Sequence, residues 1–318
     1  MFFATAFIAA LLDRILPVPT TIWGRVGHPV EWIGRGIDWL ETRLNQPEMS
    51  ATTRRRNGVL MLQVVVVLSL LAAMMLHNVL KFIPGTILIE GLIASIFLAH
   101  RDLASSVRNV AFALGRSPDA ARKAVSQIVG RDTSELDEAE ISRAAIESLA
   151  ENSSDGVIAP LFWLCLFGLP GIIAYKAINT ADSMVGHKSE RYREFGWASA
   201  RLDDWVNWLP ARLTGLLYVA ASLINRRADA GDAFDTMRRD APKHASPNAG
   251  WPEAAMAGAL NFGLGGPRSY NGEKLNLPKM GDGRRDLRAD DIHLALVLFD
   301  AMASIALGLV VLLALITG

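Results

Sequence analysis

Residues 147–190 read ESLAENSSDGVIAPLFWLCLFGLPGIIAYKAINTADSMVGHKSE, a run that is polar at both ends and apolar in the middle. The apolar segment 157–178 is long enough for one membrane crossing, but Gly168-Leu169-Pro170-Gly171 would break a helix into halves of about ten residues. A single crossing would place the two polar ends on opposite sides of a membrane. A re-entrant hairpin would bring both ends to one side, so this segment decides the topology.

Three carboxylates precede the apolar segment at helical spacing. Glu147, Glu151 and Asp155 stand at i, i+4 and i+8, so on a helix they share one face. Like charges placed this way repel, and hard oxygen ligands of this kind suit Mg²⁺, which is typically shared with a substrate phosphate. A solvated acidic face is the alternative. The adjoining apolar segment makes an unpaired acid costly, which favours the metal site.

A second polar stripe follows the apolar segment. Its members recur at i, i+3, i+4 and i+7: Lys176, Asn179, Thr180 and Ser183. Asp182 and His187 lie close to this stripe, and the acid pair Asp203-Asp204 follows. A hairpin at 157–178 would let these groups build one site with the first carboxylates.

The composition indicates a membrane protein with sizeable polar parts. The 318 residues are 51% hydrophobic and 20% charged. The 32 basic and 32 acidic residues balance, so bulk charge does not suggest nucleic-acid binding. Cys165 is the single cysteine, which excludes an internal disulfide and a thiolate metal cluster.

The predicted fold is mainly α-helical: a polytopic integral membrane protein with helical cytoplasmic segments and re-entrant helical hairpins. We expect spans at 59–79, 82–99 and 294–316, and residues 1–318 form one membrane-embedded domain. The basic triplet 54–56 marks the cytoplasmic side of a multi-pass protein of the inner cell membrane. Segment 205–224 is as ambiguous as 157–178. The charge rule is satisfied if both segments cross the membrane or if neither does. If neither segment crosses, every polar motif stays cytoplasmic.

Further helices flank these spans. Residues 1–13 predict a retained short hydrophobic helix, and Glu31–Leu44 an amphipathic helix on the membrane surface. His28 precedes it at a turn, where a lone histidine is more often structural than catalytic. Ser117-Pro118-Asp119 and the run DTSELDEAEI at 132–141 predict helix starts.

The segment 238–252 predicts an anion site. Its basic side chains are Arg238, Arg239, Lys243 and His244. Residues 246–252 read SPNAGWP, a rigid turn with backbone amides free before the next helix. A surface turn capped by Ser246 or Asn248 is an equal alternative. The run GLGGPRSYNGEKL lacks the ending of a P-loop and fits a β-hairpin equally well.

Four blocks carry a resemblance to a known family. They are HPVEWIG (28–34), ESLAENSSDGVIAPLFW (147–163), YKAINTADSMVGHKSERYREFGWASARLDDWVNWLPARL (175–213) and RDAPKHASPNAGWPEAAMAGAL (239–260). Together they resemble the adenosylcobinamide-phosphate synthase family of cobalamin biosynthesis, the CobD/CbiB family. One departure is visible: Asp13 is not followed by the Gly-Asp-Pro run that members often carry.

The resemblance implies an integral membrane enzyme that joins a carboxylate of adenosylcobyric acid to the amine of aminopropanol or its phosphate. ATP as cosubstrate and Mg²⁺ are implied with it. The expected partners are the corrinoid, the amine, the lipid bilayer and other cobalamin-pathway enzymes. The alternative functions are a non-catalytic membrane scaffold and a transporter for corrinoid intermediates.

This chemistry gives the polar residues expected roles, because an activated carboxylate needs its phosphate charge held and the attacking ammonium needs a base. The expected metal ligands are Glu147, Glu151, Asp155 and Asp182. The expected catalytic residues are His28, Glu151, Asn152, Asp182 and His187. The expected substrate and phosphate contacts are Lys176, Asn179, Lys188, Arg239, Lys243, Ser246 and Asn248.

Overall fold

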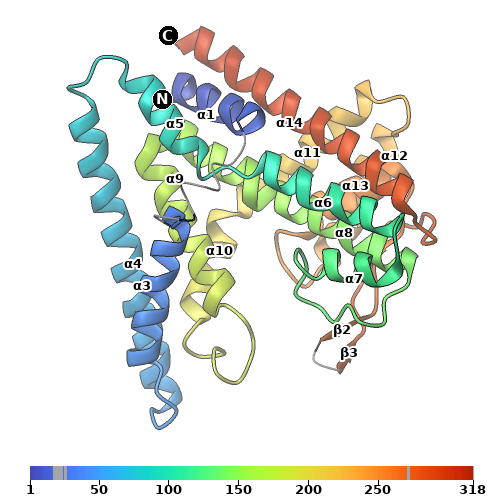
Figure 1. Cartoon of the computed structure of the whole chain (residues 1–318), viewed down its shortest axis with the longest axis horizontal. Helices are drawn as coiled ribbons and strands as arrows, with labels where there is room; N and C mark the ends of the chain where they lie inside the picture. The colour runs from blue at the N-terminus through green and yellow to red at the C-terminus, as the bar shows by residue number, and fades with distance from the viewer. Residues whose placement is uncertain (17–23, 25–26, 271–272, 318) are drawn as a thin grey trace. The chain divides into compact units, whose positions relative to one another are not determined.

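The computed structural model describes residues 1–16, 24, 27–270 and 273–317, and it is mainly helical, as predicted (Figure 1). The chain forms two compact units. The first comprises Met1–Leu98, Ala159–Asn207 and Val310–Gly318, and the second comprises Ala99–Ile158 and Trp208–Leu309. Each unit is described by itself.

In the part of the first unit that the structure describes, there are six helices and the end of a seventh. They are α1 (Phe3–Ile15), α3 (Pro29–Leu44), α4 (Ala51–Leu80), α5 (Thr86–Ser95), α9 (Ala159–Val185), α10 (Trp197–Val206) and the last residues of α14 (Ala289–Thr317). One apolar cluster joins α1, α5 and α9, and a second joins α3, α4 and α9. The predicted amphipathic helix is α3, and its buried Ile37 packs in the second cluster.

Helix α9 breaks where the sequence predicts it. Gly168 has φ 65° and ψ −153°, a backbone conformation that only glycine adopts readily, and Pro170 follows. The amide of Phe2 donates to the carbonyl of Cys165 at 3.0 Å, which satisfies one acceptor at the break. A Cβ atom on Gly171 would lie 2.4 Å from the Trp163 carbonyl oxygen, so the chain bends tightly here.

The second unit holds the remaining elements. They are α6 (His100–Leu114), α7 (Pro118–Val125), α8 (Glu138–Ser153), a π-helix (Ser154–Ile158), α11 (Trp208–Ile224), α12 (Ala230–Asp240), a 3₁₀ turn (Ala241–Lys243), α13 (Gly250–Leu260) and most of α14. Helix α13 is almost entirely buried, because its alanines let neighbouring helices approach closely. Both predicted helix starts are confirmed: Ser117 caps α7, and Asp137 and Glu140 form a capping box at α8.

The glycine-rich run forms short antiparallel strands in the second unit. β1 (Leu264–Gly265) pairs with β4 (Lys279–Met280), and β2 (Arg268–Tyr270) pairs with β3 (Glu273–Leu275). The β-hairpin alternative for this run is therefore confirmed.

Within the described residues, three helical stretches are long and apolar enough to cross a membrane: Ala51–Leu80, Glu138–Val185 and Ala289–Thr317. The predicted spans 59–79 and 294–316 fall within the first and the last. The predicted span 82–99 is not a single long helix, because α5, which lies within it, has only 10 residues. A helix of that length is about 15 Å long, half of a bilayer's hydrocarbon thickness. Segment 205–224 is interrupted at Asn207, between α10 and α11.

Candidate functional site

Asp203 lies buried in the first unit between two carboxamides. Its side chain belongs to α10 and is 8% exposed as a residue. The Nδ2 of Asn207 donates to Asp203 Oδ2 at 2.9 Å, and the Nδ2 of Asn179 donates to Oδ1 at 3.3 Å. The Tyr175 hydroxyl donates to Asn207 Oδ1 at 2.9 Å, which turns the Asn207 amide nitrogen toward the carboxylate. The carboxylate is therefore held in one orientation.

Burial, and after it the negative charge of Asp182, raise the pKa of Asp203 to about 7. The two carboxamide donors act in the opposite direction, because they favour the ionised form. A carboxyl group with a pKa near neutrality and a second carboxylate beside it is typical of functional sites. We call Asp182 and Asp203 the carboxylate pair.

Asp182 stands in the last turn of α9, where the chain leaves the helix. A Cβ atom on Gly186 would lie 1.9 Å from Asp182 Oδ1, so only glycine leaves room for this carboxylate. The next acid, Asp204, has a pKa raised by burial, while the positive charges of Arg201 and Lys188 lower it. Positive charges thus lie near Asp204, the residue that follows Asp203 in the chain.

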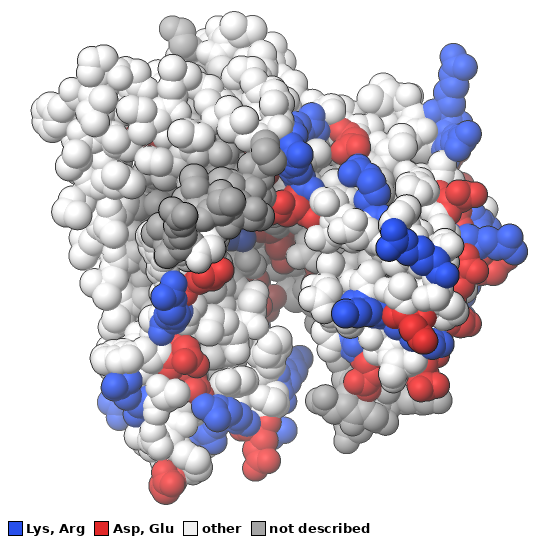
Figure 2. Space-filling model, in the orientation of Figure 1, with Lys and Arg blue, Asp and Glu red and all other residues white. Residues whose placement is uncertain are grey.

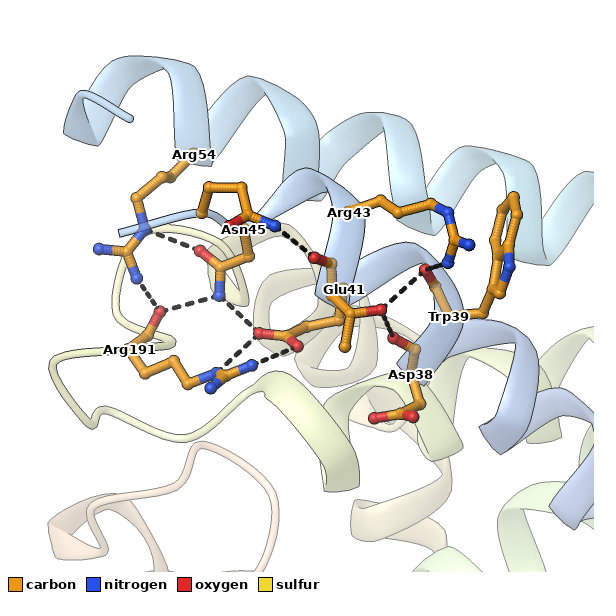
Figure 3. Close-up of polar contacts among 9 residues, drawn as sticks. Asp38, Trp39, Glu41, Arg43, Asn45, Arg54 and Arg191 are labelled. Carbon is orange, nitrogen blue, oxygen red and sulfur yellow. Dashed lines mark hydrogen bonds and ion pairs between the residues drawn. The ribbon is translucent and has the colours of Figure 1, made fainter. Parts of the chain in front are cut away.

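The loop between α9 and α10 carries His187 and Lys188, which are both exposed. Arg191 anchors this loop to α3 by a two-pronged ion pair: its Nε donates to Glu41 Oε1 at 2.8 Å and its Nη2 to Oε2 at 2.6 Å (Figure 3). Asn45 also donates to Glu41 Oε1, at 2.8 Å. This anchor fixes where the loop leaves α9.

The ion pair between Glu41 and Arg191 favours the charged form of both side chains. Burial would raise the pKa of Glu41, but the hydrogen bonds and charge of Arg191 outweigh burial and lower it. The same hydrogen bonds raise the pKa of Arg191. Sequence analysis did not single out either residue, because they lie 150 positions apart.

The carboxylates predicted before the apolar segment have three different environments in the second unit. Glu147 is buried, Asp155 is half-buried and Glu151 is exposed. Glu147 Oε1 accepts the Gly265 amide at 2.6 Å, and Oε2 pairs with Arg131 at 3.1 Å. Glu147 therefore anchors the glycine-rich turn to α8.

Among the described residues, no three Asp, Glu, His or Cys side chains lie together as a metal would need. In the second unit, Glu147 is engaged with Arg131 and Gly265. Metal binding by Glu147, Glu151, Asp155 and Asp182 stays a prediction.

Two predicted catalytic residues have local partners. Asn152 lies exposed beside Glu151, and its Nδ2 donates to the Ser148 carbonyl at 2.9 Å. His28 is the N-cap of α3, where its Nδ1 accepts the Val30 amide at 3.2 Å. His28 therefore has a structural role as a helix cap.

The predicted phosphate contacts Arg239 and Lys243 meet on Asp240. Arg239 donates to both oxygens of Asp240, at 2.9 and 2.7 Å, and Lys243 Nζ donates at 2.7 Å. These partners outweigh burial and hold the pKa of Asp240 well below its usual range. The Gly281 amide donates to the same carboxylate, so the cluster ties α12 to the turn after β4.

The turn 246–252 was predicted to present free amides, and the structure corrects this for two of them. The amides of Asn248 and Ala249 both donate to Ser246 Oγ at 3.2 Å. The Ser246 hydroxyl thus closes the turn, as in the alternative of a capped surface turn, whereas the N-cap of α13 is Ala249, which makes no side-chain cap.

Sequence spacing identifies Asn179 and Asp182 of the first-unit site but not Tyr175 or Asn207. The i, i+4 spacing of Asp203 and Asn207 was available as a signal. The hydroxyls of Thr180 and Ser183 bond back to carbonyls of their own helix, so the polar stripe is narrower than predicted.

Comparisons with known proteins agree over nearly the whole chain. Residues 6–299 match the family model described as "CobD/Cbib protein". Proteins named "Cobalamin biosynthesis protein CobD" are similar: that of Brucella anthropi is 48% identical over 96% of this chain and 94% of its own length. The one of Sinorhizobium sp. is 45% identical over 97% of each chain, and the one of Rhodobacter capsulatus is 48% identical over 96% of each. No solved structure matches.

Proposed function

The chain belongs to the CobD/Cbib protein family, and we propose that it is a membrane-bound, ATP-dependent amide-forming ligase of cobalamin biosynthesis. It joins adenosylcobyric acid to aminopropanol or aminopropanol phosphate, giving adenosylcobinamide or its phosphate. The observation that carries the proposal is the carboxylate pair, which lies within the longest block of resemblance, at residues 175–213. The three long apolar helices support membrane insertion.

The carboxylate pair fits Mg²⁺ by its donor chemistry. Mg²⁺ in enzymes is commonly bound by one or two carboxylates, with waters and substrate phosphates completing its shell. Asp182 and Asp203 supply two carboxylates, and Asp203 is already oriented by Asn179 and Asn207. When bound, the ion would neutralise phosphate charge during activation of the corrinoid carboxylate.

The surrounding side chains serve the same chemistry. A carboxylate is a poor electrophile at neutral pH, so it must be activated as an acyl phosphate or an adenylate before the amine attacks. Lys188 lies in the loop between α9 and α10, its charge acts on Asp204, and it is exposed to receive a phosphate. His187 neighbours it and is the expected acceptor of the ammonium proton. The Arg191–Glu41 ion pair keeps this loop in place.

The test is an amide-forming assay on purified protein in detergent. Adenosylcobyric acid, aminopropanol phosphate, ATP and Mg²⁺ are each omitted in turn, and products are followed by mass. We expect amide only when all four are present. Asp182→Asn and Asp203→Asn should abolish it, whereas Asp38→Asn, an exposed carboxylate of the same unit, should not.

The other candidate residues are tested in the same assay. Glu151→Ala tests whether Glu151 is a reacting carboxylate. Glu147→Gln tests whether Glu147, which anchors the glycine-rich turn, also takes part in the reaction. If folded protein forms no amide under any combination, the ligase proposal fails. The scaffold and transporter alternatives then gain support.

A further inference from the structure

A pocket of about 450 Å³ lies inside the first unit, between α4 and α9. Leu70, Met74 and His77 line it from α4, and Trp163 and Tyr175 line it from α9. The bend of α9 creates the space, because Pro170, Gly171 and Ala174 present only small side chains toward α4. The proposed chemistry does not use this pocket.

Three polar side chains of the wall, Trp163, Tyr175 and His77, have partners within the protein. Trp163 Nε1 donates to the Val206 carbonyl at 3.1 Å, and the Tyr175 hydroxyl donates to Asn207. His77 Nδ1 lies 2.5 Å from the buried carboxylate of Glu90. The wall therefore offers apolar and aromatic contact, and the matching ligand is a hydrocarbon.

The mouth of the pocket opens on an apolar surface. Of its lining residues, Phe167 is 56% exposed and Met74 is 44% exposed. The neighbouring Leu71 and Met75 of α4 are exposed too. These helices belong to stretches that are apolar enough to cross a membrane, so a ligand enters from the lipid side.

The position of the pocket along the membrane span follows from the length of α4. The basic triplet 54–56 stands at one end of the helix, and Leu70 lies about 21 Å further along, at 1.5 Å per residue. Asn78, at the rim, lies about 33 Å from Arg56, which exceeds the roughly 30 Å of a bilayer's hydrocarbon core. In the view of Figure 2, charged side chains of the first unit gather at the triplet end, and the opposite end near α5 shows almost none. The pocket thus occupies the half of the span opposite the basic triplet.

We propose that this pocket binds one acyl chain of a membrane phospholipid from the leaflet opposite the basic triplet. The chain runs along Met74 toward Leu70, and the head group lies beside Asn78 and Lys81, which are both exposed. The inference rests on the membrane insertion in the proposed function, and it does not depend on the ligase chemistry.

The test uses the fluorescence of Trp163 in reconstituted vesicles. Phosphatidylcholine with bromine atoms on its acyl chain quenches a tryptophan that it touches, and comparison with Trp163→Phe isolates Trp163 among the 8 tryptophans. We expect strong quenching of Trp163 in the otherwise native chain. Ala174→Phe and Leu70→Phe fill the pocket from opposite walls and should each remove most of it. Ala72→Phe, on the exposed face of α4, should leave quenching unchanged.

Flotation of the protein with the vesicles is measured first. A chain that does not float refutes membrane insertion and the lipid site together. A chain that floats with Trp163 unquenched refutes the lipid site alone, and so does quenching in both filled variants that is as strong as in the unmodified chain. Recovery of Trp163 emission on adding adenosylcobyric acid would assign the pocket to the substrate and overturn the proposal.

Discussion

Replacing Asp203 by asparagine should stabilise the protein at alkaline pH while abolishing its activity. The folded protein raises the pKa of Asp203 from its usual 3.8 to about 7, chiefly by burial. At about 1.36 kcal/mol per unit, ionising this carboxyl in the folded state opposes folding by about 4 kcal/mol at pH 8. Because the folded pKa is the higher one, this loss of stability begins near pH 4 and is complete above pH 7.

The asparagine removes the charge and keeps the shape. The amide nitrogen of the new asparagine takes the place of one acceptor oxygen, so one of the two neighbouring carboxamides loses its acceptor. This loss costs about 1 kcal/mol of stability. The expected net gain at pH 8 is about 3 kcal/mol, and almost no gain is expected near pH 4. A residue that destabilises the fold and yet is required for activity is typical of a functional site.

The assay is thermal unfolding of detergent-purified protein between pH 4 and pH 8. The melting temperature of Asp203→Asn should exceed that of the unmodified chain at pH 8, and the difference should vanish toward pH 4. Mn²⁺, used as a probe for Mg²⁺, should raise the melting temperature of the unmodified chain and of Asp38→Asn but not of Asp203→Asn. A variant that melts lower than the unmodified chain at pH 8 would refute the reasoning and make Asp203 a structural anchor.

Three further changes test the surroundings. Glu147→Gln removes the carboxylate that pairs with the half-buried Arg131 and should cost about 3 kcal/mol in unfolding free energy, and Arg131→Met in the same chain should recover part of it. Arg191→Lys loses the two-pronged geometry and should lower the melting temperature above pH 5. The deficit should shrink in more acidic buffer, because Glu41 has a lowered folded pKa and its contribution is lost as it protonates. Tyr175→Phe removes only the donor to the buried carboxamide, so stability should fall by about 1 kcal/mol and Mn²⁺ affinity, measured by electron paramagnetic resonance, should fall with it. An unchanged Mn²⁺ affinity would separate Tyr175 from the site.

Part of the candidate site was readable from local spacing. Asn179 and Asp182 were identified because polar side chains recur at helical intervals after the apolar segment. Tyr175 was not, because a tyrosine in an apolar run reads as core until its hydroxyl partner is known. The role of Glu147 was also out of reach, since its partners Arg131 and Gly265 lie 16 and 118 positions away along the chain.

The sequence by itself determined the helical class, the break at Gly168–Gly171, the caps of α7 and α8, and the first and last long apolar helices. These features depend on residues within one or two turns of each other, where periodicity, capping and glycine or proline chemistry act directly. Only the tertiary structure decided which charges are neutralised. Glu41 pairs with Arg191, which lies 150 positions away along the chain, and Asp203 lies near the carboxylate of Asp182. Burial and electrostatics depend on all neighbours in space, and chain spacing does not encode those neighbours.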